Sequence, residues 1–338
     1  MPPRVIHTAQ ALVDAVLEVP ALPRRGANSM ASGYERYAGG AVNILLAAAR
    51  SGATCVHAGA HGEGPNGDLV REALAAEGVS VSAPVVRGED TGICVVMLEP
   101  SGERTFVTTQ LAEREITVES LQTSQPVAGD LVCVSGYSLV GRTRDPLLGW
   151  LESLPAQVHV VLDPGAIFAE LDEPVRRRAL ALTDVWTSNA EEAEALTGEV
   201  EMTMAAQAAL AHLAPGAVAV VRDGAKGCAV ASGDLPATLV AGYPERAVDT
   251  NGAGDCHTGV LVAERARGTD WVEACRRSNA AGAIKVTRRG PATAPTAAEI
   301  DSYIDRLPAE PPAAQSPPAQ PPPGAESLRR QREPTSFA

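Results

Sequence analysis

Aromatic residues make up only 3% of this 338-residue chain, whereas 45% of its residues are hydrophobic. The core must therefore consist mostly of Ala, Val, Leu and Ile. Basic residues are also scarce, because 28 Lys and Arg stand against 41 Asp and Glu, for a formal net charge of −13. A protein that wraps nucleic acid needs clustered Lys and Arg, so we expect no nucleic-acid partner. Phosphate groups are not excluded, since backbone N–H groups at a helix N-terminus can bind them.

The sequence also lacks the usual marks of secretion, membrane insertion and zinc binding. Its six cysteines are widely spread and none forms C-x-x-C, which predicts a reducing, cytoplasmic setting. The six histidines do not form H-E-x-x-H or another metal-binding spacing. We find neither a signal-peptide hydrophobic region nor an apolar run of about 20 residues, so we expect no membrane association.

Proline is concentrated at the C-terminal end of the chain. Residues 308–338 hold nine of the 26 prolines, among Ala, Gln, Ser and Arg. A segment with few backbone donors and little apolar surface is typical of a disordered or polyproline-II tail. The sequence therefore predicts one domain over residues 1–307 and a disordered, Pro-rich tail over residues 308–338.

The N-terminal 307 residues alternate strand-like and helix-like segments. Buried strands are expected at residues 4–8, 54–58, 130–135, 158–163, 184–188 and 217–222. Helices are expected at residues 41–51, 67–77, 144–154, 174–182, 190–197 and 204–213. Several strands are continuous apolar runs, which is typical of a parallel sheet covered on both faces. We therefore expect an α/β fold with a doubly wound, mainly parallel sheet flanked by helices.

Two segments interrupt this alternation. Residues 91–99 and 104–110 are strand-like and flank a Ser-Gly turn, which indicates a hairpin. Residues 14–37 are also extended and contain Pro20, Pro23 and Gly26. We expect these two insertions, at about residues 12–38 and 88–112, to form a small antiparallel β lid. Ligands of open α/β sheets bind at the carboxyl ends of the strands, where such a lid would cover them.

The strongest chemical motif is D-T-N-G-A-G-D at residues 249–255, which precedes a helix-like run. Gly252 and Gly254 allow a tight turn that brings backbone N–H groups close to a ligand, and the helix N-terminus adds the positive end of its dipole. Such an anion hole suits a transferring phosphoryl group, and Asp255 beside it can accept a proton from an attacking hydroxyl. The structural alternative is a Gly-rich turn in which Asp255 caps the helix.

Several motifs, taken in order, resemble those of the ribokinase-like (PfkB) carbohydrate kinases. The D-T-N-G-A-G-D segment, followed by Gly259, is similar to the C-terminal signature of that family. Residues 38–43, A-G-G-A-V-N, with Gly52 and Gly62 downstream, resemble its N-terminal signature. Further similar elements lie at Asp14 with residues 22–26, and at residues 189–192, 222–227 and 278–283. The ordered resemblance covers about residues 4–307.

This resemblance implies a ribokinase-like fold and the ATP-dependent phosphorylation of a hydroxyl of a sugar or related polyol. It implies in-line transfer with Asp255 as general base and an anion hole formed by Gly252, Ala253 and Gly254. The small lid is also expected to pair two copies of the chain, an implication that the residues themselves neither support nor exclude.

Further site residues follow from the same resemblance. The residues implied in substrate binding are Asp14, Gly39, Gly40 and Asn43. The residues implied in nucleotide binding are Asn189, Arg222, Gly224, Lys226, Gly227, Thr250 and Asn279. Glu192 is implied in binding Mg²⁺, and a K⁺ site with backbone ligands near Asp249 and residues 285–295 is left open. Asn189 and Glu192 also fit a helix capping box, a role that can coexist with ligand binding.

Some residues depart from the pattern of ribokinases proper. Leu12 stands where ribokinases place a sugar-binding Asn, which argues against D-ribose. A nucleoside kinase is the first alternative, with Tyr34, Tyr37, Phe106 and Tyr137 as the residues that could stack on a base; a catalytically silent binding protein is the second.

A competing motif lies at residues 62–67. This segment, G-E-G-P-N-G, matches the dinucleotide fingerprint G-x-G-x-x-G, but no clear strand with an acidic residue at its end follows it.

Overall fold

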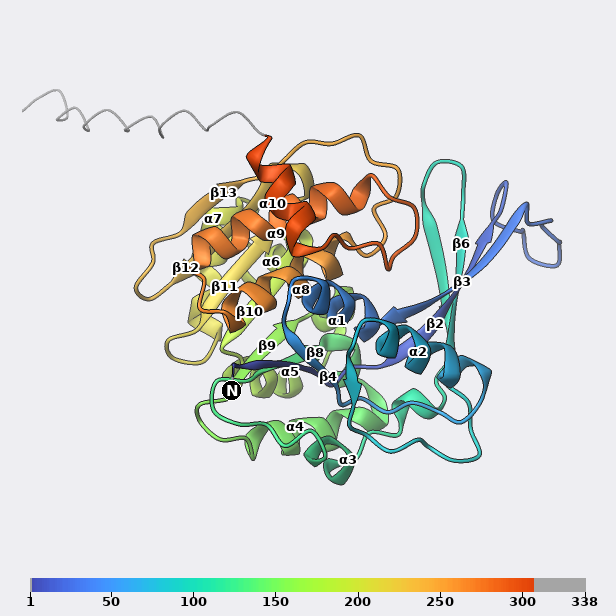
Figure 1. Ribbon diagram of the computed structural model, residues 1–338, viewed down its shortest axis with the longest axis horizontal. Coiled ribbons are helices and arrows are strands. Elements are labelled where there is room, and N and C mark those ends of the chain that lie inside the picture. Colours follow the sequence, from blue (N-terminus) through green and yellow to red (C-terminus); the bar gives the residue numbers. More distant parts are fainter. Residues whose placement is uncertain (1, 307–338) are drawn as a thin grey trace, which may run out of the picture.

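The computed structural model describes residues 2–306. The predicted tail at residues 308–338 lies outside the described residues. A nine-stranded sheet forms the centre of the molecule, in the order β13-β12-β11-β10-β9-β8-β1-β4-β5 (Figure 1). Its strands are β1 (Arg4–His7), β4 (Thr54–His57), β5 (Ser80–Val81), β8 (Leu131–Ser135), β9 (His159–Asp163), β10 (Val185–Asn189), β11 (Val218–Arg222), β12 (Gly227–Ser232) and β13 (Thr238–Ala241).

The large sheet is parallel from β5 to β11, and β12 and β13 join its edge in antiparallel pairs. Helices cover both of its faces, as the continuous apolar strands predict. The helices are α1 (Ala41–Arg50), α2 (Pro65–Ala76), α3 (Val118–Gln122), α4 (Arg144–Glu152), α5 (Glu173–Ala181), α6 (Ala190–Thr197), α7 (Met202–Ala209), α8 (Ala253–Ala266), α9 (Trp271–Val286) and α10 (Ala297–Asp305).

Alternate residues of the central strands contact different helix layers. In β1, Val5 belongs to the core shared with α1, α2 and α8, whereas Ile6 belongs to the core shared with α4 and α5. Both side chains are fully buried. This period of two is the one expected of a strand with helices on both faces. The predicted fold class, a mainly parallel sheet flanked by helices, is confirmed.

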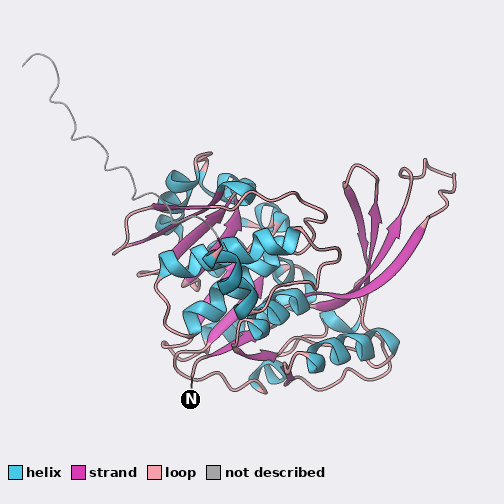
Figure 2. Cartoon of the chain, turned by 45° about the horizontal axis from the view of Figure 1, so that its top comes forward, coloured by secondary structure: helices cyan, strands magenta, loops and turns pink. Residues whose placement is uncertain are grey.

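A second sheet of four strands projects from the body of the molecule (Figures 1 and 2). Its strands, in the order β3-β2-β6-β7, are β2 (Ala11–Glu18), β3 (Gly33–Gly40), β6 (Ile93–Leu98) and β7 (Arg104–Thr108). We call this sheet the lid. Its two outer pairs are antiparallel, as predicted, and its central pair, β2 with β6, is parallel.

Small residues allow α1 and α8 to pack closely. A Cβ atom added to Gly259 would lie 2.4 Å from the carbonyl oxygen of Ile44 and 2.6 Å from Cβ of Ala47. Only glycine fits this contact without displacing backbone. The close packing places the N-terminal turn of α8 beside the first turn of α1, and this is where the candidate site lies.

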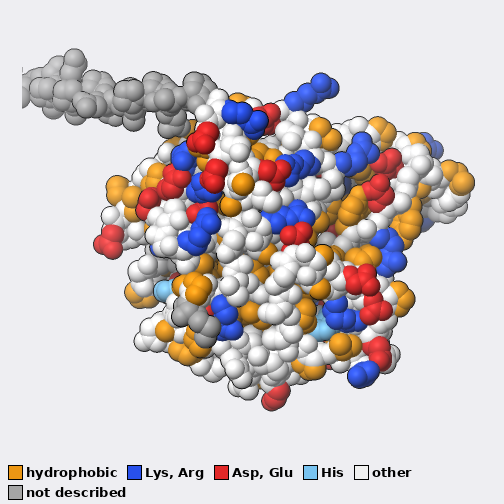
Figure 3. Space-filling model, viewed as in Figure 1, with side chains coloured by type: hydrophobic (Ala, Val, Ile, Leu, Met, Phe, Trp, Pro, Cys, Tyr) orange, Lys and Arg blue, Asp and Glu red, His pale blue; other side chains and the backbone are white. Residues whose placement is uncertain are grey.

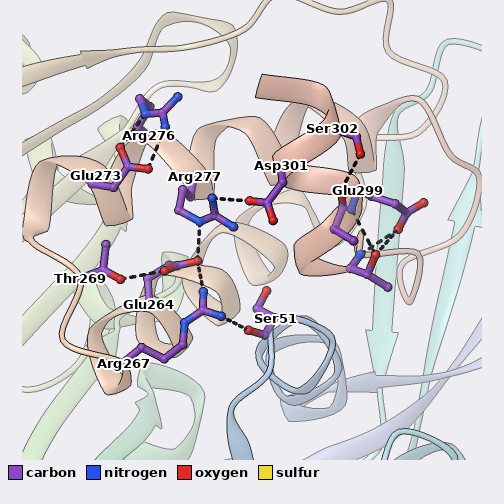
Figure 4. A network of polar contacts seen from close by, with 12 residues as sticks. Ser51, Glu264, Arg267, Thr269, Glu273, Arg276, Arg277, Glu299, Asp301 and Ser302 are labelled. Carbon is purple, nitrogen blue, oxygen red and sulfur yellow. Dashed lines mark hydrogen bonds and ion pairs between the residues drawn. The ribbon is translucent and has the colours of Figure 1, made fainter. Parts of the chain in front are cut away.

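A buried carboxylate connects the C-terminal helices (Figure 4). Glu264, on α8, is 2% exposed and accepts hydrogen bonds from Arg267, from Arg277 Nε at 2.6 Å and from Thr269 Oγ1 at 2.9 Å. Arg267 also donates to the carbonyl oxygen of Ser51, at the end of α1. Burial raises the pKa of Glu264, but the hydrogen bonds from the arginines outweigh it, so the pKa is lowered overall. The carboxylate is therefore ionised in the folded chain at neutral pH.

We expect Glu264→Gln to lower the free energy of unfolding by about 3 kcal/mol, because it removes the buried charge that pairs with Arg267 and Arg277. Arg277 would keep only Asp301, a partner that is 56% exposed. Urea denaturation at pH 7 measures the change. Glu173→Gln is the matched control, since Glu173 pairs with Arg177 on the surface and this loss should stay below about 1 kcal/mol. Equal losses in the two variants would contradict the structural role of Glu264.

Basic and acidic side chains are interspersed on the face of the molecule seen in Figure 3. Among residues 2–306, no helix combines the length and the apolar character needed to cross a bilayer.

Candidate active site

A cleft of about 840 Å³ opens between the lid and the carboxyl ends of the parallel strands. Nine of the site residues predicted from the sequence line it: Asp14, Gly40, Asn43, Asn189, Glu192, Arg222, Gly224, Gly254 and Asp255. They come from the lid, from α1, from the ends of β10 and β11, and from the first turn of α8. Residues separated by more than 200 positions in the sequence therefore meet in one cavity.

The N-terminus of α8 forms one wall of this cleft. Its N-cap residue Gly252 has φ = 75°, and a Cβ atom there would lie 2.8 Å from the carbonyl oxygen of Pro291. Within the described chain, no side chain caps this helix, and Gly254 and Asp255 of its first turn line the cleft. The N–H of Ala253 donates to the carbonyl oxygen of Thr250 at 3.2 Å. Backbone N–H groups and the helix dipole make such an end suitable for an anion.

Asp255 lies in the same first turn of α8. Its Oδ2 atom accepts a hydrogen bond from Nδ2 of Asn43, on α1, at 3.0 Å. Burial raises the pKa of Asp255 to about 6, and the charge of Asp163 contributes to this rise, while Asn43 and Arg222 oppose it. A carboxylate with a pKa just below neutral pH can be ionised and still accept a proton.

Asp14 reaches the cleft from lid strand β2. Burial raises the pKa of Asp14 to about 7, and the negative charge of Asp255 adds to this rise. Gly39, on the neighbouring strand β3, leaves room for the carboxylate, because a Cβ atom there would lie 2.3 Å from Oδ2 of Asp14. Gly40 has φ = 62° and lies against the carbonyl oxygen of Gln10, so glycine also allows the chain to turn from β3 into α1.

Asp163, at the carboxyl end of β9, is a site residue that the sequence did not single out. Its Oδ2 atom pairs with Nη2 of Arg222 at 3.3 Å and accepts a hydrogen bond from Thr258 Oγ1 at 3.2 Å. Arg222 Nη1 also donates to the carbonyl oxygen of Gly254 at 2.8 Å. The group fixes the first turns of α8 against the ends of β9 and β11. An acidic residue that ends a continuous apolar strand was the signal available in the sequence.

Asn189 and Glu192 form the capping box of α6. The backbone N–H of Asn189 donates to Glu192 Oε2 at 2.9 Å, and the N–H of Glu192 donates to Asn189 Oδ1 at 2.7 Å. Burial and the charge of Asp163 raise the pKa of Glu192, whose side chain lines the cleft. Among the described residues, no group of three or more His, Cys, Asp or Glu has the geometry of a metal site. A Mg²⁺ ion here would need oxygen ligands from a bound nucleotide and water, which is how Mg²⁺ is commonly held.

Several other predicted residues lie around the cleft and not in its lining. Asn279 donates to the carbonyl oxygens of Val240 and Ala241, so it holds α9 against β13. Lys226 is exposed and pairs with Asp223. The remaining ones are Gly39, Gly227, Thr250, Gly252 and Ala253. Their assignments to nucleotide, substrate or phosphate stay predictions.

A carboxylate from outside the loop at residues 62–67 accepts hydrogen bonds from the backbone N–H groups of this loop. The carboxylate of Asp90 accepts hydrogen bonds from the N–H groups of Asn66 at 3.1 Å and of Gly67 at 2.9 Å. A Cβ atom at Gly64 would lie 2.6 Å from Cγ of Asp90. The start of α2 is thus occupied by a side chain of this protein, which accounts for a dinucleotide-like pattern without a dinucleotide.

The four aromatic residues considered for base stacking occupy different positions. Phe106, on β7, and Tyr137 line the cleft and are about half exposed, at 56% and 47%. Tyr37 lies against Gly290 in a neighbouring pocket, and Tyr34 is exposed on β3.

Comparison with known proteins adds independent findings. The family model described as pfkB family carbohydrate kinase matches residues 4–298. The chain is 31% identical to an uncharacterised sugar kinase of Escherichia coli strain K12, over 88% of this chain and 92% of that protein. It is 29% identical to the ribokinase of Haemophilus influenzae, over 86% of this chain and 95% of that protein.

Solved structures with a similar fold belong to proteins with similar names. A protein of E. coli assigned as ribokinase II, solved with ATP and Mg²⁺, superposes with a TM-score of 0.76. The two chains are 26% identical, and the match covers 90% of this chain and 100% of that one. A family match over nearly the whole chain, with the same fold and with the motifs gathered in one cleft, is decisive. The chain belongs to the pfkB family of carbohydrate kinases.

Proposed function

We propose that this kinase transfers the γ-phosphoryl group of ATP in line to a hydroxyl of a sugar or related polyol, with Asp255 as the general base. The observation that carries this proposal is the position of Asp255. It lies in the uncapped first turn of α8, within a cleft, with a pKa raised to about 6. The adjacent N–H groups of Gly252, Ala253 and Gly254 would stabilise the charge that develops on the phosphoryl oxygens.

The acceptor would be bound by Asp14 and Asn43, with Gly39 and Gly40 leaving room for it. The Oδ1 atom of Asn43 is buried, and no described residue donates a hydrogen bond to it. A substrate hydroxyl that donates to Oδ1 would satisfy this atom, because an unpaired buried acceptor is unfavourable. The same amide donates through Nδ2 to Asp255, so one side chain would position both the hydroxyl and its base.

ATP would lie against the ends of β10 and β11. Arg222 and Gly224 line that part of the cleft, and Glu192 with Asp163 provides carboxylates there. Mg²⁺, when bound, bridges phosphate oxygens and neutralises part of their charge. Glu192 would hold this ion from the capping box of α6, where its position is already fixed by the N–H of Asn189.

A coupled ADP-release assay across sugars, polyols and nucleosides tests the proposal. Nucleosides belong in the panel because Phe106 and Tyr137 line the cleft and could stack on a base. We expect turnover with a sugar or polyol. ADP release with nucleosides alone would assign the nucleoside alternative, and no ADP release with any acceptor would reject the proposed acceptor class.

The pH dependence of the reaction should reflect the two raised carboxyl groups. Both Asp14 and Asp255 have folded-state pKa values above those of free Asp, at about 7 and about 6, so each becomes protonated as the pH falls through this range. We expect kcat/KM for the sugar to decline below pH 7, with apparent pKa values of the pair between about 6 and 7. Asp163→Asn removes a charge that raises the pKa of Asp255, so the lower limb should move to lower pH. A wild-type profile that stays flat down to pH 5 would contradict this assignment.

We also infer a reducing, cytoplasmic setting and a contact between lids of two copies. The first is supported by the cysteines, all of which lie in the described range and are free and buried. The second is supported by Tyr34 and Val107, apolar side chains on lid strands that are 60% and 58% exposed. Sedimentation velocity, compared between the wild type and Val107→Asp, tests the lid contact.

A further inference from the structure

Asp249 is a junction between the anion-hole loop, the lid and α9. Its carboxylate accepts hydrogen bonds from the N–H groups of Asn251 and Gly290, both at 2.9 Å. It also forms an ion pair with Arg104, on lid strand β7, whose side chain is only 17% exposed. The backbone N–H of Asp249 donates to the carbonyl oxygen of Val286, at the end of α9. This one residue therefore links the loop that leads into α8 to the lid and to α9.

A buried ammonium group lies at the same junction. Lys285, on α9, is fully buried, and its Nζ atom donates to the carbonyl oxygen of Asp249 at 2.9 Å. The chain has only two lysines, and the other, Lys226, is exposed. Lysine is almost never fully buried unless it is paired. Burial lowers the pKa of Lys285, and the charge of Asp249 opposes this effect.

This arrangement bears on the K⁺ site left open by the family resemblance. That site would use backbone ligands near Asp249 and residues 285–295. Here the carbonyl oxygen of Asp249 already binds a protein cation, and the Asp249 carboxylate is engaged by Arg104 and two N–H groups. A K⁺ ion at the same carbonyl would have to displace or repel the Lys285 ammonium across a few ångströms of low-dielectric interior. The residues present therefore do not fit a K⁺ ion.

We propose that the ammonium of Lys285 is a built-in monovalent cation, which positions the loop at residues 249–252 and makes the kinase independent of K⁺. The inference rests on the proposed use of the α8 N-terminus as the anion hole. Lys285 is a positioning residue, because it acts through the Asp249 carbonyl and lies behind the loop. Its positive charge reaches the site as well, since it helps to oppose the rise in the pKa of Asp255.

The test compares the wild type with Lys285→Met and Lys285→Arg in KCl and in tetramethylammonium chloride of equal ionic strength. The wild type should have the same kcat in both salts. Lys285→Met should lose at least about tenfold in kcat in tetramethylammonium, because a displaced anion hole is costly, and KCl should restore part of that loss. Lys285→Arg keeps the charge at similar length, so it should retain more activity than Lys285→Met and gain nothing from KCl.

Thermal melting without substrates gives a readout that is separate from activity. The melting temperature of the wild type should be equal in the two salts, whereas K⁺ should raise that of Lys285→Met. A wild type that KCl activates tenfold or stabilises would overturn the proposal, as would full activity of Lys285→Met in tetramethylammonium. If Lys285→Met does not fold, the salt comparison on the wild type still decides. Absence of kinase activity in every salt and with every acceptor would reject the proposed function. The melting comparison would then still test whether the Lys285 ammonium takes the place of K⁺.

Discussion

Asp255→Asn is expected to lower kcat by about 10³-fold, because it removes the carboxylate that we propose takes the hydroxyl proton while leaving the proposed anion hole in place. The KM for ATP should change little, since Asn keeps the size of the side chain. The measurement is single-turnover kinetics with the best acceptor of the panel. A variant with wild-type turnover would show that another group is the base.

The same variant should be more stable than the wild type at alkaline pH. The pKa of Asp255 rises from 3.8 to about 6 on folding, so the ionised form is disfavoured in the folded chain. Two pKa units correspond to about 3 kcal/mol, which Asp255→Asn would regain at pH 8 and not at pH 4, where the carboxyl is protonated in the folded chain. A loss of activity accompanied by a gain in stability separates a catalytic role from a structural one.

Gly39→Ala is expected to lower kcat/KM for the sugar by about 100-fold, because the new methyl group would overlap the Asp14 carboxylate and displace it by about 1 Å or more. The KM for the acceptor should rise, and the KM for ATP should stay close to that of the wild type. Steady-state kinetics with each substrate varied in turn measures both.

Gly33→Ala is the matched control for this variant. Gly33 lies on the same strand, and its Cβ would meet the end of the Glu18 side chain at 3.0 Å, which can move aside toward solvent. We expect wild-type kinetics for Gly33→Ala. If both variants behave alike, the effect comes from strand β3 in general and not from the room that Gly39 leaves for Asp14.

The order of strands and helices in the body could be predicted from the sequence because burial on both faces leaves continuous apolar runs. The six predicted strands of the large sheet all form, within one to two residues of the expected ends. Strands β5, β12 and β13 were not predicted. Strands β5 and β13 are short and lie at the two edges of the sheet, whereas β12 has six residues and pairs with both β11 and β13. The parallel pairing of β2 with β6 depends on two insertions about 75 residues apart and leaves no local pattern.

The candidate site likewise contains residues that a local motif predicts and residues that only the folded chain brings together. Asp255, Gly252 and Gly254 could be predicted because a single motif contains the turn, the helix start and the carboxylate. Asp163 and Lys285 could not, because their roles arise only when β9 and α9 come against α8 in space. Asp90 was missed for the same reason, because it lies more than 20 residues beyond the loop that it contacts. Contacts between residues far apart in the sequence therefore complete the candidate site, and no single motif contains them.

The two proposed site carboxylates belong to different parts of the molecule, and this has a consequence for the reaction. Asp14 belongs to the lid strand β2, whereas Asp255 belongs to the core helix α8. If Asp14 binds the acceptor as proposed, the acceptor hydroxyl would meet Asp255 only where β2 and α8 border the same cleft, as they do here. Without an acceptor, no substrate hydroxyl would lie beside Asp255, so we expect slow hydrolysis of ATP alone. Coupling between the two substrates would then follow from the position of Asp14 on β2.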